Sequence, residues 1–414
     1  MWELIKSNQR KSVFLFTGMA VTLMLLGYLI GSTFYPDGGG VFGLSIAIII
    51  WTVLSIISVT AGSSLVLSIS QAKEVTPAVH QQLFNVVEEM KLAAGLPAMP
   101  KVYIIDSSAL NAFATGKDPS HSAVAVTAGL LSKLNRDELQ GVIGHEMSHI
   151  MNRDTKFMTY AAVMLGTIVI ISEIFVKGMF YSGAGRRYGS RSKNSGGQAQ
   201  IIILAIAVIF AILAPIMARL LYFALSRKRE YLADASSARL TRYPEGLASA
   251  LEKISDCSDD LPSANKVTAA MYIANPLKKK GMKLSDLSST HPPISERIRI
   301  LRGMMYGAGF SDYQKSFSAL KRSSAAIIPA SGLRDAAVIP LRAAGEDQAE
   351  PQTAVQEKRK LGNIMMAVND YSTINCECGL KIKMPPGFGM NRPEITCPRC
   401  GRKHRVESAG RIKI

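Results

Sequence analysis

Four long apolar runs constrain this chain more than any other feature, because segments of this length are stable across a lipid bilayer but not at a water-exposed surface. The runs cover residues 14–30, 41–69, 157–180 and 201–225. They come in two pairs, so we expect two apolar helical hairpins in a mainly α-helical membrane protein. Hydrophobic residues make up 48% and charged residues 19% of the 414 residues, which fits membrane segments combined with soluble parts.

The charges that flank the runs predict the orientation in the membrane. Basic residues precede the first run, so we expect both ends of the first hairpin in the cytoplasm of a multi-pass protein of the cell (inner) membrane. The connection at 181–200 is basic and has no acid. If the second pair of runs spans the membrane, this basic loop lies outside the cell, against the positive-inside rule. The alternative is that the second pair forms a hairpin that is only partly inserted in the membrane. We attribute the net charge of +17 to cytoplasmic flanks and anionic lipid, and do not expect nucleic acid as a partner.

Between the two hairpins, the sequence His145-Glu-Met-Ser-His149 places two histidines four residues apart. Residues with that spacing point the same way on an α-helix, so both imidazoles would face one metal ion. Two neutral nitrogens suit zinc, and the Glu146 carboxylate beside them can take a proton from a water. Asn135 and Glu138 predict a capping box at the start of this helix. The alternative is a partly buried helix with two histidines and no metal.

A third metal ligand is expected after the fourth apolar run, where a helix is predicted to begin at Ser226. Glu230 is an acid among basic residues, and Asp234 follows on the same helical face. By itself this pattern is equally typical of a solvated face with salt bridges. Together with His145 and His149 it favours a catalytic zinc, which takes three protein ligands and leaves a fourth position for water. Asp234 would then accept the outer N–H of a ligand histidine.

Short strands are predicted ahead of the metal helix. Residues 101–105 and 123–127 are rich in β-forming residues, and 111–116 lead through a polar turn into the second of them. An amphipathic helix is expected at 77–95. An extended peptide could add as a strand beside 111–114 or 123–127 through backbone pairing, which tolerates many peptide sequences.

Four stretches, in this order and spacing, resemble the HtpX-type membrane-bound zinc metalloproteases, relatives of the CAAX prenyl proteases. The stretches are Asn111-Ala-Phe-Ala-Thr-Gly116, His145-Glu-Met-Ser-His-Ile-Met-Asn152, Arg229-Glu-Tyr-Leu-Ala-Asp234, and His291-Pro-Pro with Arg297. The resemblance implies an α+β, zincin-like metalloprotease domain of the gluzincin type. The site residues it implies are His145, His149 and Glu230 for zinc, Glu146 as general base, His291 for polarising the scissile carbonyl, and Asn111 and Ala112 for holding an extended substrate on an edge strand. From its own context, His291 on a rigid loop would more often be structural.

The resemblance also implies a function. The chain would be a membrane-tethered, zinc-dependent endopeptidase that hydrolyses damaged or misfolded membrane proteins. The orientation predicted from the basic N-terminus places its active site on the cytoplasmic face. Its partners would be the lipid bilayer and unfolded or membrane protein substrates. One alternative is a CAAX-type prenyl protease, although such relatives enclose substrate in a larger ring of membrane helices than four runs provide. Another is a catalytically silent membrane adaptor, which would have no need for Glu146.

Four of the five cysteines crowd near the C-terminus, beyond the reach of the resemblance. Cys376 with Cys378, and Cys397 with Cys400, form two knuckles at a spacing close to that of a zinc ribbon. Four thiolates suit a closed, structural zinc site, with a redox dithiol as the alternative. The partner of this ribbon is left open.

These features divide the chain into six expected segments. They are an N-terminal transmembrane hairpin (1–70), the first part of the metalloprotease domain (71–156), a second membrane hairpin (157–225), the second part of the metalloprotease domain (226–302), a linker (303–365) and a zinc-ribbon-like domain (366–414). The linker is expected because that stretch is rich in Ala, Ser, Gln and Pro.

Overall fold

The computed structural model describes most of the chain. The described residues are 2–35, 37–181, 195–264, 268–269, 271–274, 276, 291–322, 326–328, 330–333, 339–345, 353–388 and 394–405. The basic residues expected in the second membrane loop (Arg186, Arg187, Arg191 and Lys193) lie outside these ranges.

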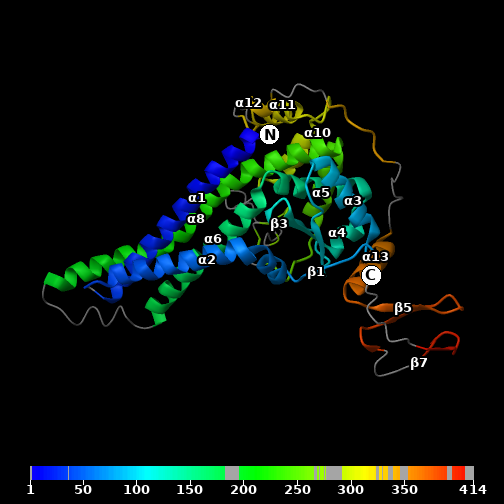
Figure 1. Ribbon diagram of the computed structural model, residues 1–414, viewed down its shortest axis with the longest axis horizontal. Helices are drawn as coiled ribbons and strands as arrows, with labels where there is room; N and C mark the ends of the chain where they lie inside the picture. Colours follow the sequence, from blue (N-terminus) through cyan, green and yellow to red (C-terminus); the bar gives the residue numbers. More distant parts are fainter. Residues whose placement is uncertain are drawn as a thin grey trace.

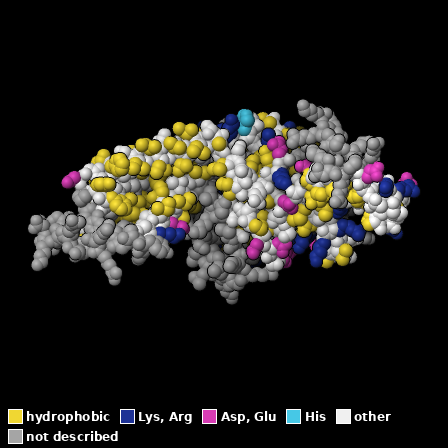
Figure 2. Space-filling view, turned by 90° about the horizontal axis from the view of Figure 1, so that it is seen from below, with side chains coloured by type: hydrophobic (Ala, Val, Ile, Leu, Met, Phe, Trp, Pro, Cys, Tyr) yellow, Lys and Arg dark blue, Asp and Glu magenta, His cyan; other side chains and the backbone are white. Residues whose placement is uncertain are grey.

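Four long helices form an arm on one side of the molecule (Figure 1). They are α1 (Trp2–Phe34), α2 (Gly39–Ile69), α6 (Asp154–Tyr181) and α8 (Ser195–Thr241). Among the described residues, three segments are long and apolar enough to cross a membrane, namely Val13–Phe34, Gly39–Ile69 and Asp154–Gly178, and α8 contains a shorter apolar stretch, Ile201–Met217. Figure 2 shows hydrophobic side chains covering the arm, whereas most charged side chains lie over the rest of the molecule. The arm therefore has the apolar character expected of membrane helices in α1, α2 and α6, whereas the apolar stretch of α8 is shorter than the predicted run 201–225.

The last helix of the arm differs from the prediction. A separate helix beginning at Ser226 is wrong, because the fourth apolar run and the Glu230 segment form one helix of 47 residues. The change from apolar to charged residues near Ser226 marks a change of surroundings, and both kinds of residue are compatible with a helix. Glu230 and Asp234 are therefore continuous with the arm.

A four-stranded sheet lies beside the arm and presents one edge toward the site. Its strands are β1 (Ala72–Glu74), β2 (Lys101–Ile105), β3 (Ala112–Asp118) and β4 (His121–Thr127), in the order β1-β2-β4-β3. β2 and β4 are parallel, and β3 pairs antiparallel with β4. Because β4 lies between two strands, the expectation that a peptide could pair beside 123–127 is wrong. The edge near the site is that of β3.

The metal helix of the prediction is α5 (Arg136–Met151), packed in the main hydrophobic core. The capping box is present: Asn135 Oδ1 accepts from the Glu138 N–H, and Glu138 Oε2 accepts from the Asn135 N–H, both at 2.9 Å. Around α5 lie α3 (Gln81–Ala94), α4 (Ala128–Lys133), α9 (Pro244–Asp256) and α10 (Ile294–Arg302). α9 comes so close that a Cβ on Gly141 would lie 2.5 Å from the backbone nitrogen of Leu247. This contact fixes α5 in the core.

The segment predicted as a linker, 303–365, is partly helical and packed, so that prediction is wrong for much of its length. It contains α11 (Phe310–Lys321), α12 (Ala330–Leu333) and most of α13 (Ala354–Val368). Phe310, Tyr313 and Phe317 recur at helical spacing and are buried in the main core. Three apolar side chains at helical spacing within a polar stretch are too few to give a clear helical period, so the sequence did not predict this helix.

α13 docks the C-terminal region onto the main hydrophobic core. Ile364 and Val368 are buried in the main core, and Asn369 accepts a hydrogen bond from Lys73 and donates one to Asp106. Beyond it, β5 (Ser372–Asn375) pairs with β6 (Lys381–Met384), and β7 (Glu394–Thr396) pairs with β8 (Lys403–Arg405). These two small sheets lie at the end of the molecule away from the arm (Figure 1).

Candidate active site

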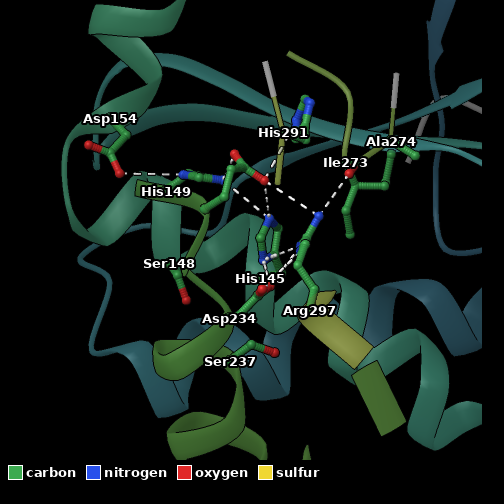
Figure 3. Close-up of polar contacts among 12 residues, drawn as sticks. His145, Ser148, His149, Asp154, Asp234, Ser237, Ile273, Ala274, His291 and Arg297 are labelled. Carbon is green, nitrogen blue, oxygen red and sulfur yellow. Dashed lines mark hydrogen bonds and ion pairs between the residues drawn. The ribbon is translucent and has the colours of Figure 1, made fainter. Parts of the chain in front are cut away.

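Two histidines of α5 and an acid of α8 converge in the interior (Figure 3). His145 Nε2 and His149 Nε2 are 3.3 Å apart. Glu230 Oε2 lies 3.6 Å from His145 Nε2, and Glu230 Oε1 lies 3.5 Å from His149 Nε2. One potential ligand atom from each of the three residues falls within 4.8 Å of the others, and all three side chains are buried. The structure thus brings together the three residues predicted as metal ligands.

The donor and acceptor pattern of this cluster fits a cation. Each histidine faces a carboxylate with its Nδ1, which leaves its Nε2 as an acceptor directed at the centre of the cluster. Glu230 adds two further acceptors there, and its buried Oε2 has no hydrogen-bond partner among the described residues. The same acceptors attract a proton: burial acts to lower the pKa of His145, but the adjacent carboxylates of Asp234 and Glu230 raise it to about 9. Two imidazoles and a carboxylate at this spacing suit zinc.

His145 is oriented by Asp234, as the sequence predicts. His145 Nδ1 lies 3.0 Å from Asp234 Oδ1. Arg297, from α10, donates to both oxygens of the same carboxylate and is itself completely buried. Burial acts to raise the pKa of Asp234, but the positive charge of Arg297 outweighs it and lowers the pKa. Asp234 therefore stays ionised and holds the Nδ1 proton of His145.

His149 has an equivalent support that the sequence analysis missed. Its Nδ1 lies 3.4 Å from Asp154 Oδ2, at the first residue of α6. Arg229 Nε lies 3.7 Å from Asp154 Oδ1, and its guanidinium stacks 3.6 Å from the centre of the Phe157 ring. An acid at the start of an apolar helix is common for helix-dipole reasons alone, so Asp154 gave no separate signal. The Nδ1 of each ligand histidine thus faces a buried carboxylate, and each of these carboxylates pairs with an arginine.

Glu146 lies in the same buried site without joining the three ligand atoms. Its carboxylate is 1% exposed and accepts from the backbone of Ala114 on β3. Burial raises its pKa above the usual range, and this outweighs the lowering effect of His145 and His149. A raised pKa improves a carboxylate as a proton acceptor near neutral pH.

His291 is also part of the site. It is buried just before α10, and its Nε2 lies 3.6 Å from Glu230 Oε2. Burial lowers its pKa to about 4, so the imidazole is neutral near pH 7. A neutral imidazole can donate one hydrogen bond to a polarised oxygen.

Asn111 and Ala112 lie at the outer edge of the sheet, and their polar groups that face away from the sheet already form hydrogen bonds. The Asn111 side chain donates to the Ala274 carbonyl oxygen at 2.9 Å and accepts from the Ala274 N–H at 3.3 Å. The Ala112 carbonyl oxygen accepts from the Ile273 N–H at 2.9 Å. Both edge residues are therefore paired with another segment of the same chain.

The four C-terminal cysteines form a second cluster, far from the first in sequence. Cys376 Sγ lies 3.5 Å from Cys400 Sγ, Cys378 Sγ lies 3.7 Å from Cys397 Sγ, and all four are free thiols. Each knuckle closes on its first cysteine: the N–H of Gly379 donates to Cys376 O, and the N–H of Gly401 donates to Cys397 O. Both glycines have positive φ, 82° and 74°, which favours glycine there.

One thiol of this cluster is poised to ionise. Burial acts to raise the pKa of Cys397, but the N–H groups of Cys400 and Arg399 outweigh it and lower the pKa to about 6. A thiolate is the form that binds zinc.

Comparisons with known proteins agree with the geometry of the first cluster. Residues 77–305 match the model of peptidase family M48. A Dictyoglomus turgidum protein called "Protease HtpX homolog" is 46% identical over 303 residues, which are 73% of this chain and 94% of that protein. Proteins of the same name from Streptococcus uberis and Listeria monocytogenes serotype 4b are 40% and 43% identical, each matched over its full length and over 73% of this chain.

A crystal structure of Ste24p from S. mikatae is similar at a lower level. It is 17% identical, with a TM-score of 0.38, and the match covers 73% of this chain and 67% of that one. The family match ends at residue 305, so the cysteine cluster lies outside it.

Proposed function

This chain belongs to peptidase family M48 and is a metalloprotease, and we propose that it degrades damaged or misfolded membrane proteins at a zinc held by His145, His149 and Glu230. The observation that carries the proposal is the convergence of three buried acceptors around one point, with a paired carboxylate behind each histidine. Two histidines and a glutamate are a gluzincin-type ligand set. It leaves a fourth position for water, as a catalytic zinc requires.

The protein residues around that point have separate roles in peptide hydrolysis. The zinc, when bound, activates a water and polarises the peptide carbonyl. Glu146 accepts the proton of the attacking water at its carboxylate and delivers it to the leaving amine. His291, buried and neutral, donates a hydrogen bond to the oxygen of the scissile carbonyl as negative charge develops there. Asp234 and Asp154 keep the two ligand imidazoles in the tautomer that presents Nε2.

Substrate binds, in this proposal, as an extended strand along the outer edge of β3. Asn111 and Ala112 lie on this edge, and the backbone of Ala114, two residues further along, contacts Glu146. A peptide paired here would pass directly over the general base. Backbone pairing gives affinity with little sequence preference, which suits an enzyme for unfolded chains.

We place the active site on the cytoplasmic face of the inner membrane. α5 ends before the second hairpin and Glu230 follows it, and the packing of α5 against α8 supports both ends of that hairpin lying on one side. Arg153 and Lys228 are exposed and flank the apolar stretch. Cysteines placed at these two positions should be labelled from the same side. Labelling from opposite sides would exclude the three-ligand site.

The C-terminal cysteine cluster is proposed to hold a second, structural zinc in a ribbon. Two knuckles, each closed by a glycine N–H on the carbonyl oxygen of its first cysteine, and four Sγ atoms within 4.8 Å of one another support it. The ribbon would contact an as yet unidentified partner or substrate. Such a closed four-thiolate site has no position for water and takes no part in hydrolysis.

Neither alternative function is favoured by the site. A silent adaptor would not need a buried Glu146 beside the ligand cluster, and a prenyl protease would use a larger ring of helices than the four long ones in the described arm. The quality-control role can be tested with one membrane protein in two states. Purified enzyme in proteoliposomes should cleave the unfolded form faster than the folded form, and equal rates would contradict this role.

A further inference from the structure

The outer edge of β3 is occupied by residues 271–274 of the same chain. Ile273 donates its N–H to the Ala112 carbonyl oxygen, and Ala274 is bound through both its N–H and its carbonyl oxygen by the Asn111 side chain. Arg297 Nη1 donates to the Ile273 carbonyl oxygen at 3.1 Å, a contact visible in Figure 3. The segment is thus attached to the edge strand on one side and to the arginine of the zinc site on the other.

The segment runs in the direction of an antiparallel strand. Ile273 pairs with Ala112 and Ala274 with Asn111, so the residue number rises on one side as it falls on the other. One step back, the Tyr272 and Phe113 rings meet edge to face with centroids 5.1 Å apart. Cross-strand neighbours make such contacts. Continuing the same count sets Met271 opposite Ala114, the residue whose backbone contacts Glu146.

These contacts exclude a substrate strand at the same place. A peptide that pairs with Ala112 needs the carbonyl oxygen that Ile273 now uses, and one held by Asn111 needs the amide that now holds Ala274. Among the described residues, segment 271–274 is held at the edge by one backbone hydrogen bond to Ala112 and by the Asn111 side-chain amide. A peptide that follows β3 past Ala114 can form more backbone hydrogen bonds than this. A tethered segment nevertheless competes at a high effective concentration.

We propose that residues 271–274 act as a built-in competitor that mimics a substrate strand and must leave the β3 edge before a peptide can bind there. This inference rests on the proposed function, since it concerns access to the same site. It predicts selectivity by length: a short peptide, which offers few backbone hydrogen bonds, displaces the segment less readily than a long unfolded chain does. The competitor would thereby give short peptides a higher KM than long unfolded chains.

A reversible crosslink tests the displacement directly. Phe113→Cys combined with Tyr272→Cys places two thiols on the facing positions where the rings now meet edge to face. With the disulfide verified by mass spectrometry, cleavage of an unfolded membrane protein should stop, and a reductant should restore it. The two single variants are the controls. Undiminished cleavage by the oxidised double variant would overturn the inference, whereas absence of zinc-dependent cleavage in both single variants, if folded, would count against the proposed function itself.

A second pair of variants does not depend on a disulfide. Ile273→Pro removes the N–H that binds Ala112, whereas Ile273→Ala keeps it and removes only the side chain. Ile273→Pro should lower KM for a short extended peptide about 2- to 12-fold relative to Ile273→Ala, the range for one net hydrogen bond, with zinc content unchanged. An equal or higher KM in the folded proline variant would contradict a competing segment.

Discussion

Arg297 binds both carboxylate oxygens of Asp234, with its Nε 2.8 Å from Oδ2 and its Nη2 2.7 Å from Oδ1. The same Oδ1 lies 3.0 Å from Nδ1 of His145. All three side chains are buried, so the ion pair is little screened by solvent. A two-bond contact of this kind fixes the plane of the carboxylate and, through it, the direction of the ligand imidazole.

Asp234→Asn should weaken zinc binding without removing a ligand. The amide is neutral and has one acceptor oxygen, so Arg297 loses its two-bond carboxylate partner and the Nδ1 proton of His145 loses a charged acceptor. Loss of such a support lowers metal affinity by about 10- to 100-fold. Competition against a chelator dye measures this, with Ser236→Ala as control, because Ser236 is buried on the same helix and its hydroxyl donates to Leu232 O. Unchanged affinity would remove Asp234 from the site.

Asp154→Asn should have a similar effect through the other histidine. The two supports act on different ligands, so we expect a loss of about 10- to 100-fold in zinc affinity here as well. A cobalt-substituted enzyme provides a second readout, since its visible spectrum changes when a ligand imidazole turns. Thr167→Ala is the matched control on α6, because its hydroxyl donates to Val163 O of the same helix. A wild-type spectrum and affinity in Asp154→Asn would show that His149 needs no such support.

The position of α13 predicts where the chain can be shortened. Removing residues after Tyr371 takes away the cysteine cluster and should lower zinc content by one per chain while short-peptide cleavage persists. Removing α13 as well exposes the core around Ile364, so it should destabilise the protease domain. Ile364→Ala alone should lower the free energy of unfolding by about 2–5 kcal/mol. Thermal unfolding in detergent measures both effects, and equal stability of the two truncations would show that α13 is not part of the core.

More of the site than of the fold could be predicted from the sequence. His145, His149 and Glu146 lie on one helix, so their relation follows from helical spacing alone. Glu230 and Asp234 were expected near the two histidines on chemical grounds. The helix that carries them begins well before its predicted start at Ser226. The pairing of Asp154 with Arg229 was missed, because it joins the two ends of a hairpin. A single sequence does not show that these two ends lie close together in space. The self-pairing of Ala112 with Ile273 depends on a segment without regular structure, for which no periodic pattern exists.

The central claim is that a zinc at His145, His149 and Glu230 drives peptide hydrolysis with Glu146 as the base. The most direct measurement compares zinc content and cleavage of an unfolded membrane protein by the wild-type chain and by Glu146→Gln. We expect the variant to keep its full zinc content while cleavage falls at least about 100-fold, the lower end for loss of a general base. Chelation should stop wild-type cleavage, and added zinc should restore it. Persistent cleavage by zinc-free protein, or full activity in zinc-loaded Glu146→Gln, would contradict the claim.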